Sequence, residues 1–411
     1  MFIFILPFCF FPFLVSSELV GLVQLARHGA RSPLKKYPWD NSPWKVEMGE
    51  LTSEGSMQHY IIGQEFRQRY IIKEKFLNST LSLQEIYIQS TDFRRTIKSA
   101  QSQMLGFYPN GPILSSNSMQ SKAIPPFEIP EFSNTMNTLG LNALPYSFQP
   151  VVIKVMEKKH DRLLLGHEDG CEIMKEYKKA AKEYDTYKLR VLDYEKRYKD
   201  KLEKILNMGI ISFEEASYVA DALECIKFHN YPLPDGIDEN IYDALMEIKD
   251  YKNSFFYEVE DALKLAVSEF FIELVKTFNK IIKVHSLDEN KETDTETLDV
   301  DKVNSFIQSV PKYKLYLAHD TTLISILSAL EAWNSFAPPF ASTLLFELHK
   351  INGDFLVKTI FNDVVLKMQK CYSGLCNYNY FKTMLEKKIN PKYELICQVN
   401  IVKNKETING Q

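Results

Sequence analysis

Residues 22–33 read Leu-Val-Gln-Leu-Ala-Arg-His-Gly-Ala-Arg-Ser-Pro, an apolar run that stops at His28 between Arg27 and Arg31. The apolar character of residues 19–26 predicts a strand buried on both faces, as in a parallel sheet. The glycine and proline that follow indicate a tight turn where this strand ends. Two arginines and a histidine are therefore expected in one crevice at a strand end.

This turn suggests chemistry on a phosphate group. Arginine is always charged and can bind phosphate through two parallel hydrogen bonds. A neutral imidazole is a competent nucleophile. A surface turn with two solvated arginines would give the same short pattern, so this stretch alone does not decide the function.

Two further predicted strands also end in ionisable residues just before a helix. One is followed by Arg94 and Arg95, and the other by His319 and Asp320. Taken singly, the first pair fits a solvated helix start, and the second fits a helix cap. Ligands bind at the carboxyl ends of strands in open α/β sheets, so three such turns together predict one site.

These stretches resemble the signatures of the histidine acid phosphatases, a branch of the phosphoglycerate-mutase-like superfamily. Residues 27–33 are similar to the family's RHGxRxP motif, and residues 90–96 to its STDxxRT segment. Residues 51–70 resemble LTxxGxxQHYxLG, and His319-Asp320 resembles a second signature. The resemblance implies an α/β fold with a mostly parallel sheet, helices on both faces and a helical cap insertion.

The resemblance implies hydrolysis of phosphate monoesters through a covalent phosphohistidine. His28 would be the nucleophile, and Asp320 would protonate the leaving oxygen. The residues expected to hold the phosphate are Arg27, Arg31, Arg95 and His319. The arginines should lower the pKa of His28, so that a neutral nucleophile persists in acid, where Asp320 is expected to be protonated.

The remaining ionisable candidates receive no catalytic role. His59 is expected to be a packing or capping residue on a helix, and His160 and His167 are expected at the surface. Arg94 could be solvated or could add charge at the rim of the site. No cofactor and no metal is expected, since no cluster has zinc or magnesium spacing.

The chain divides into four predicted parts. Residues 1–17 form a signal peptide. Residues 18–150 and 305–411 form the α/β phosphatase core. Residues 151–304, with their helical periodicity, form the cap insertion over the strand ends.

The first 15 residues are almost wholly apolar and short for a bilayer span. They fit a signal peptide cut near Ser17 or Glu18, although no positive charge precedes the apolar run. An uncleaved anchor is the alternative. A secretory route would make the protein secreted or lysosomal (vacuolar), and it would make Asn78, in the sequon Asn-Ser-Thr, a glycosylation site.

Five cysteines remain outside the predicted signal peptide. The family resemblance implies disulfides between Cys171 and Cys397 and between Cys371 and Cys376. It leaves Cys225 as a free thiol, because Thr343 occupies the position of its partner. Scattered buried thiols are the alternative that counting leaves open.

The 411 residues carry a formal charge of −4 and a pI near 6.1, which argues against a nucleic-acid partner. The expected partner is a small phosphomonoester, with no stable membrane anchor after signal cleavage. The oligomeric state stays open, a homodimer included. A phytase-like or mutase-like enzyme is one alternative. Arg94 and Lys35-Lys36 leave open the basic charge that a phytase would need, whereas a mutase usually lacks a signal peptide and disulfides. A secreted binding protein on an inactive scaffold is the other, although no signature residue is lost.

Overall fold

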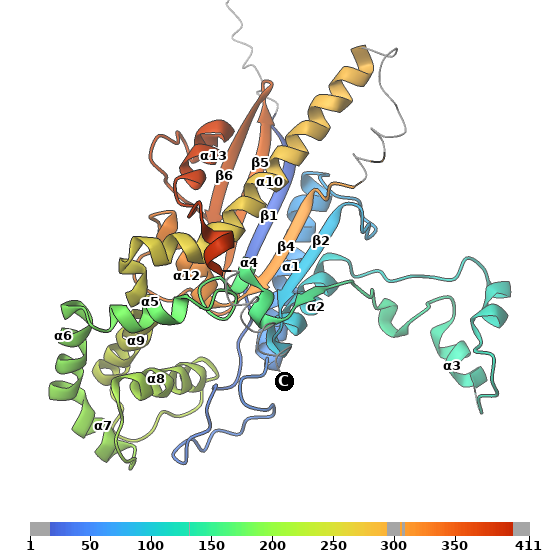
Figure 1. Cartoon of the computed structure of the whole chain (residues 1–411). Helices are drawn as coiled ribbons and strands as arrows, with labels where there is room; N and C mark the ends of the chain where they lie inside the picture. Colours follow the sequence, from blue (N-terminus) through green and yellow to red (C-terminus); the bar gives the residue numbers. More distant parts are fainter. Residues whose placement is uncertain (1–16, 131, 294–304, 306–308, 398–411) are drawn as a thin grey trace, which may run out of the picture.

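The computed structural model describes residues 17–130, 132–293, 305 and 309–397 (Figure 1). The predicted signal peptide therefore lies outside the described residues, except for Ser17. The strands are β1 (Ser17–Arg27), β2 (Ile86–Thr91), β3 (Lys154–Met156), β4 (Tyr313–Ala318), β5 (Thr343–Ile351), β6 (Asp354–Phe361), β7 (Val364–Val365) and β8 (Leu375–Asn377). The helices are α1 (Ser53–Phe66), α2 (Arg94–Phe107), α3 (Phe132–Leu139), α4 (Arg162–Leu165), α5 (Met174–Ala181), α6 (Asp185–Tyr194), α7 (Asp200–Ile205), α8 (Phe213–Phe228), α9 (Glu239–Ser254), α10 (Glu260–Thr293), α12 (Asp320–Ala329) and α13 (Tyr378–Glu386).

One mixed sheet organises the molecule, with strand order β3-β2-β4-β1-β5-β6-β7 and β8 beside β6. The first four strands in this order run parallel to one another. The next strand, β5, runs antiparallel to β1 and forms a hairpin with β6. The Asn352-Gly353 turn of this hairpin has φ angles of 51° and 88°, the left-handed conformation that this dipeptide adopts readily.

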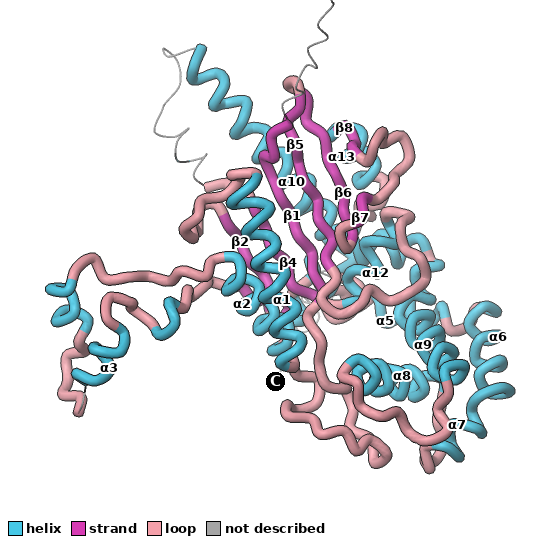
Figure 2. Tube along the Cα trace, turned by 180° about the vertical axis from the view of Figure 1, so that it is seen from behind, coloured by secondary structure: helices cyan, strands magenta, loops and turns pink. Residues whose placement is uncertain are grey.

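Helices cover both faces of the sheet because β1 is apolar on both of its faces. Leu22 and Ala26 pack into the cluster that includes α1 and α2, whereas Val23 and Leu25 pack with α10 and α12. Figure 2 shows α1 and α2 in front of the sheet, and Figure 1 shows α10 on the opposite side. The predicted fold class is confirmed.

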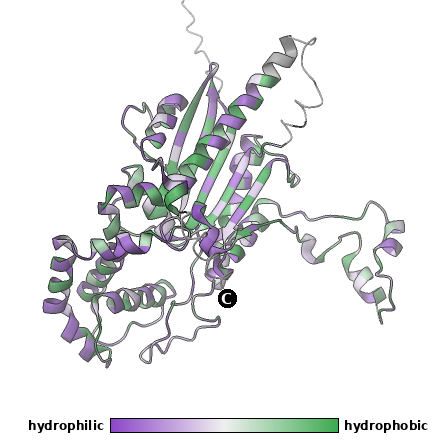
Figure 3. Cartoon of the chain, in the orientation of Figure 1, coloured by the Kyte–Doolittle hydropathy of each residue, from purple (hydrophilic) through white to green (hydrophobic). Residues whose placement is uncertain are grey.

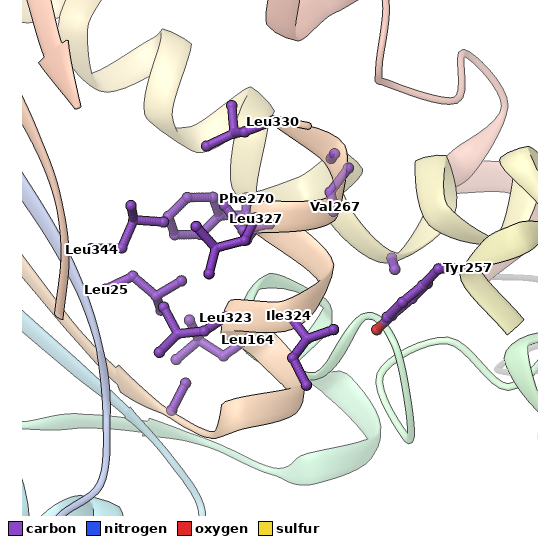
Figure 4. Packing of buried hydrophobic residues seen from close by; sticks show 14 of the residues in the cluster. Leu25, Leu164, Tyr257, Val267, Phe270, Leu323, Ile324, Leu327, Leu330 and Leu344 are labelled. Carbon is purple, nitrogen blue, oxygen red and sulfur yellow. The ribbon is translucent and has the colours of Figure 1, made fainter. Parts of the chain in front are cut away.

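On the face covered by α10 and α12, side chains of the strands pack directly against side chains of the helices. Figure 4 shows Leu25 and Leu344 of the sheet facing Phe270 of α10 and Leu323 and Leu327 of α12. All five side chains are at most 2% exposed. Burial on this scale contributes about 1.5–3 kcal/mol per large apolar side chain, so this layer fixes the start of α12 against the sheet.

Segment 151–304 contributes to more than the cap. Its first strand, β3, pairs with β2 in the sheet, and α10 packs along a sheet face. Helices α6 to α9 lie beyond the carboxyl ends of the parallel strands (Figure 1). The division into core and cap stays a prediction.

A long excursion at residues 109–150 projects away from the sheet (Figures 1 and 2). Its helix α3 has no buried residue. The base of the excursion is joined by backbone hydrogen bonds, including Gly111 N to Ser147 O and Leu114 N to Leu141 O.

The structure contains the two disulfides that the family resemblance implied, Cys171–Cys397 and Cys371–Cys376. Cys225 is a free thiol and is fully buried.

Asn78, in the predicted glycosylation sequon, is exposed. Apolar residues in Figure 3 gather on the strands and on the helix faces that meet them, and no helix among the described residues is long and apolar enough to cross a membrane.

Candidate active site

The three turns singled out from the sequence meet at one edge of the sheet. Strands β2, β4 and β1 are neighbours in that order, so the residues after each strand lie side by side. They border a cavity of about 230 Å³. Its lining comprises His28, Arg31, Leu34, Phe93, Arg95, Glu168, Ser217, Tyr218, Asp221, Lys249, Lys252, Asn253, His319, Asp320 and Thr321.

Five of the six predicted catalytic and phosphate-binding residues line this cavity. The sixth, Arg27, is fully buried behind it. Its Nη1 donates to the carbonyl oxygen of Pro338 at 2.6 Å, and its Nη2 lies 2.7 Å from Asp320 Oδ2. Its guanidinium carbon lies 4.2 Å from the centre of the Phe340 ring, a cation–π contact.

His28 is held in one tautomer. Its Nδ1–H donates to the carbonyl oxygen of Gly29 at 2.8 Å, so the neutral ring carries its lone pair on Nε2. Burial, together with Arg95, Arg27 and Arg31, lowers the pKa of His28 well below its usual range. The ring is therefore neutral and has one basic nitrogen.

The guanidinium of Arg31 is fixed by the cap. Its two terminal nitrogens donate to the carboxylate of Asp221 on α8, at 2.5 and 3.2 Å. This carboxylate also accepts from the backbone N–H of Leu34 at 3.0 Å. Arg31 and these contacts lower the pKa of Asp221 despite its burial.

Arg95 and His319 face each other across the cavity floor. Arg95 Nη2 lies 3.5 Å from His319 Nδ1, and the Arg95 guanidinium lies 4.5 Å from the centre of the Phe93 ring. On the other side of its ring, His319 Nε2 lies 3.0 Å from the Thr91 hydroxyl at the end of β2. Burial, and then Arg95, lowers the pKa of His319 well below its usual range.

The three arginines each retain an unsatisfied donor. The buried Nε atoms of Arg27, Arg31 and Arg95 have no hydrogen-bond partner among the described residues. A buried donor without a partner is costly, and an anion in the cavity is the ligand that would satisfy the donors of Arg31 and Arg95 together. The cavity thus suits a tetrahedral oxyanion such as phosphate.

Asp320 differs from the expectation that it is protonated in acid. Its Oδ1 accepts from the backbone N–H of Thr321 at 2.9 Å, and Oδ2 is the carboxylate oxygen beside Arg27. Burial opposes ionisation, but Arg27, Lys249 and Arg31 together lower the pKa of Asp320 well below its usual range. The ion pair with Arg27 thus outweighs burial and favours the ionised form of Asp320.

Two predictions about histidines have opposite outcomes. His59 is buried and donates from Nε2 to the carbonyl oxygen of Arg27 at 3.0 Å, which confirms its structural role. His167 was expected at the surface, and this is wrong: it is 1% exposed, and its Nε2 lies 2.8 Å from Thr321 Oγ1. The loop that precedes Cys171 is folded onto the start of α12, which buries this ring; His160 is exposed, as expected.

Arg94 does not line the cavity. Its guanidinium pairs with Glu47 at 3.0 Å and with Glu50 at 2.7 Å, and its side chain is 68% exposed. These contacts neutralise the extra charge at the rim.

The sequence reasoning missed the wall of the cavity that the cap supplies. Asp221, Lys249 and Lys252 come from α8 and α9, which read as ordinary amphipathic helices. Lys249 is nearly buried, and its Nζ lies 2.7 Å from Glu224 Oε2. The sequence carries no signal for these residues, because the burial of the Lys249 charge is visible only in the structure.

The fold and this cavity define an α/β enzyme of the phosphatase class. The model of the histidine phosphatase superfamily (branch 2) matches residues 18–362, so the chain belongs to this family. Its relatives include the lysosomal acid phosphatase of Rattus norvegicus, 27% identical over 86% of this chain and 72% of the relative. The prostatic acid phosphatase of Homo sapiens is also 27% identical, over 88% of this chain and 82% of the relative.

Solved structures with the same fold include bacterial phytases. The Hafnia alvei phytase in complex with tartrate has a TM-score of 0.61 at 15% identity, covering 92% of this chain and 98% of that one. The Citrobacter braakii phytase has a TM-score of 0.60 at 15% identity, covering 92% and 99%. At this identity the likeness concerns the fold alone.

Proposed function

We propose that this enzyme hydrolyses small phosphate monoesters through a phosphohistidine on His28. The observation that carries the proposal is the placement of a neutral histidine beside Arg31 and Arg95 in one cavity, with Arg27 buried directly behind it and each arginine keeping an unpaired Nε donor. In the first step, His28 Nε2 forms a bond to phosphorus while the bond to the alcohol oxygen breaks. The arginines and His319 hold the non-bridging oxygens and offset their charge.

Asp320 supplies the proton to the leaving oxygen in this proposal. Because Asp320 is ionised beside Arg27, it must first gain a proton. A bound phosphate is negatively charged and offsets part of the positive charge of Arg27. The ionised form of Asp320 is then stabilised less, so the pKa of Asp320 rises. In acid, a phosphate monoester enters with one proton of its own, since its second pKa is about 6, and this proton can pass to Asp320.

In the second step, water attacks the phosphohistidine. Asp320, now ionised again, takes a proton from the water, and the bond between phosphorus and Nε2 breaks. Inorganic phosphate leaves, and His28 is again neutral. The low pKa of His28 keeps the nucleophile available in acid, so an activity optimum above neutrality would contradict this scheme.

The experiment that tests the proposal is hydrolysis of 4-nitrophenyl phosphate at acid pH. The wild type is expected to be active and His28→Ala to be inactive. His160→Ala, which removes an exposed histidine, is the matched control and should retain full activity. Equal activity of wild type and His28→Ala, or no hydrolysis by the wild type, overturns the proposal and favours a binding protein on this scaffold.

We also propose that the protein enters the secretory route and is secreted or lysosomal, with residues 1–17 removed and Asn78 glycosylated. The relatives named as lysosomal enzymes, the two disulfides and the exposed sequon support this. N-terminal sequencing and a mass shift on deglycosylation, absent in Asn78→Gln, would test it. A mature protein that begins at Met1 would contradict it.

A further inference from the structure

The cavity has a second wall that the proposed reaction does not use. It consists of Tyr218 on α8 and of Lys249, Lys252 and Asn253 on α9, and we call it the cap wall. The three arginines lie on the core side, at the strand ends and the turns that follow them. A substrate whose phosphate reaches His28 must therefore place its alcohol portion against other residues, and the cap wall borders the same cavity.

The charges of most cavity residues are already balanced by partners. Arg31 is paired with Asp221, and Lys249 with Glu224 at 2.7 Å. Glu168, on the loop that also borders the cavity, has no such partner, because His167 at 3.7 Å is buried and its pKa is lowered to about 4.

Lys252 differs from Arg31 and Lys249, because no carboxylate of the described residues lies within 4.0 Å of its ammonium group. Its Nζ instead lies 4.1 Å from the centre of the Tyr218 ring. The ammonium of Lys35 lies 3.9 Å from the same ring centre but is paired with Glu215 at 2.8 Å.

The surroundings of Lys252 favour an incoming anion. The lysine is partly buried, and it feels the positive charges of Lys178, Lys35 and Lys182 as well as the negative charge of Glu214. Burial and these like charges lower its pKa. An anion bound here would relieve the repulsion and complete the pairing of the ammonium.

We propose that Lys252, with Tyr218 and Asn253, forms a second anion-binding subsite, so that the enzyme prefers phosphate monoesters whose alcohol portion carries another anionic group. This inference rests on the proposed hydrolysis and adds the substrate class. A carboxylate and a second phosphate share the required chemistry. The asparagine amide and the tyrosine hydroxyl can add hydrogen bonds to either group.

The test compares four phenyl phosphates that differ in the ring substituent: none, 4-carbamoyl, 4-carboxylate and a second phosphate. Phosphate release gives kcat/KM for each ester. The carbamoyl ester is the neutral counterpart of the carboxylate ester in size and shape. For the wild type, we expect the carboxylate ester or the bisphosphate to exceed the carbamoyl ester by about fivefold, as for one partly solvated ion pair.

Lys252→Gln should abolish this preference. The matched control is Lys204→Gln, which removes the same charge from an exposed position on α7 that does not line the cavity, and which should keep the preference. A preference confined to the bisphosphate identifies a second phosphate as the ligand, and one shared by both esters identifies anions in general.

Three results would overturn the subsite: equal kcat/KM for charged and neutral esters in the wild type, a preference that survives in Lys252→Gln, or one that is lost equally in Lys204→Gln. Each of these leaves phosphate ester hydrolysis intact. If the wild type cleaves none of the four esters, the proposed function fails, and the subsite fails with it.

Discussion

The two disulfides should differ strongly in what they contribute to stability, because they close loops of very different length. Cys171 and Cys397 are 226 residues apart, whereas Cys371 and Cys376 are 5 apart. A cross-link stabilises the native state mainly by restricting the unfolded chain, and the restriction grows with the logarithm of the loop length. The loop-entropy relation gives about 5 kcal/mol for the first disulfide and about 2 kcal/mol for the second.

The perturbation is replacement of each pair by alanine in two double variants. The two variants are well matched, since each removes one fully buried cysteine (Cys171 or Cys376) and one partly exposed cysteine. The loss of Cys171–Cys397 should therefore lower the free energy of unfolding by about 3 kcal/mol more than the loss of the other disulfide.

The assay is urea unfolding followed by tryptophan fluorescence, with the free energy extrapolated to water. Activity on 4-nitrophenyl phosphate adds a second measurement. Removal of Cys171–Cys397 should also reduce activity, because the loop before Cys171 carries the His167 ring that contacts Thr321 beside Asp320. Equal destabilisation by the two variants, or a larger effect of Cys371–Cys376, would refute the loop-length reasoning.

Three other expectations concern the site. Asp320→Asn should lower kcat/KM for phenyl phosphate by about 10²–10⁴-fold but much less for 4-nitrophenyl phosphate, whose nitrophenolate leaves without a proton; kcat/KM reports the step in which the alcohol leaves and not the shared hydrolysis of the phosphohistidine, so equal losses in kcat/KM would argue against Asp320 as the proton donor. Asp221→Asn leaves Arg31 buried without its carboxylate and should cost about 3 kcal/mol in urea unfolding, against under about 1 kcal/mol for the exposed Asp193→Asn. Burial lowers the pKa of His167 from 6.5 to about 4. As the pH falls from 6.5 to 4, the histidine of the unfolded chain is protonated while that of the folded chain stays neutral, so the free energy of unfolding decreases. Relative to His167→Gln, the wild type should lose about 3 kcal/mol between pH 7 and pH 4, and urea curves without this loss would show that the ring is not buried neutral.

The strand ends were predictable because local pattern and chemistry agree there. His28, Arg95 and Asp320 each follow a short apolar run, and the register of a parallel sheet places such runs in one layer. The hairpin at Asn352-Gly353 was predictable for the same reason, since the dipeptide favours the required backbone conformation.

The cap side of the site was not predictable, because a polar residue on an amphipathic helix looks the same whether it faces solvent or a cavity. Lys252 and Asp221 gain their meaning only from the placement of α8 and α9 over the strand ends. His167 was misplaced for a related reason: its loop is polar, but the contact with Thr321 joins positions 154 residues apart. The protonation of Asp320 also depends on a distance, the 2.7 Å to Arg27, that adjacency in the signatures does not give.

The position of β1 in the middle of the sheet has a consequence for biosynthesis. Its parallel neighbour pairs Leu22 with Tyr313, and its antiparallel neighbour pairs Ser17 with Ile351. The ribosome thus releases the central strand first and both of its partners about 290 or more residues later. Pairing of such high contact order is slow, so the strand that leads into His28 stays unpaired until both partner strands have been made, and the candidate site at its end assembles late.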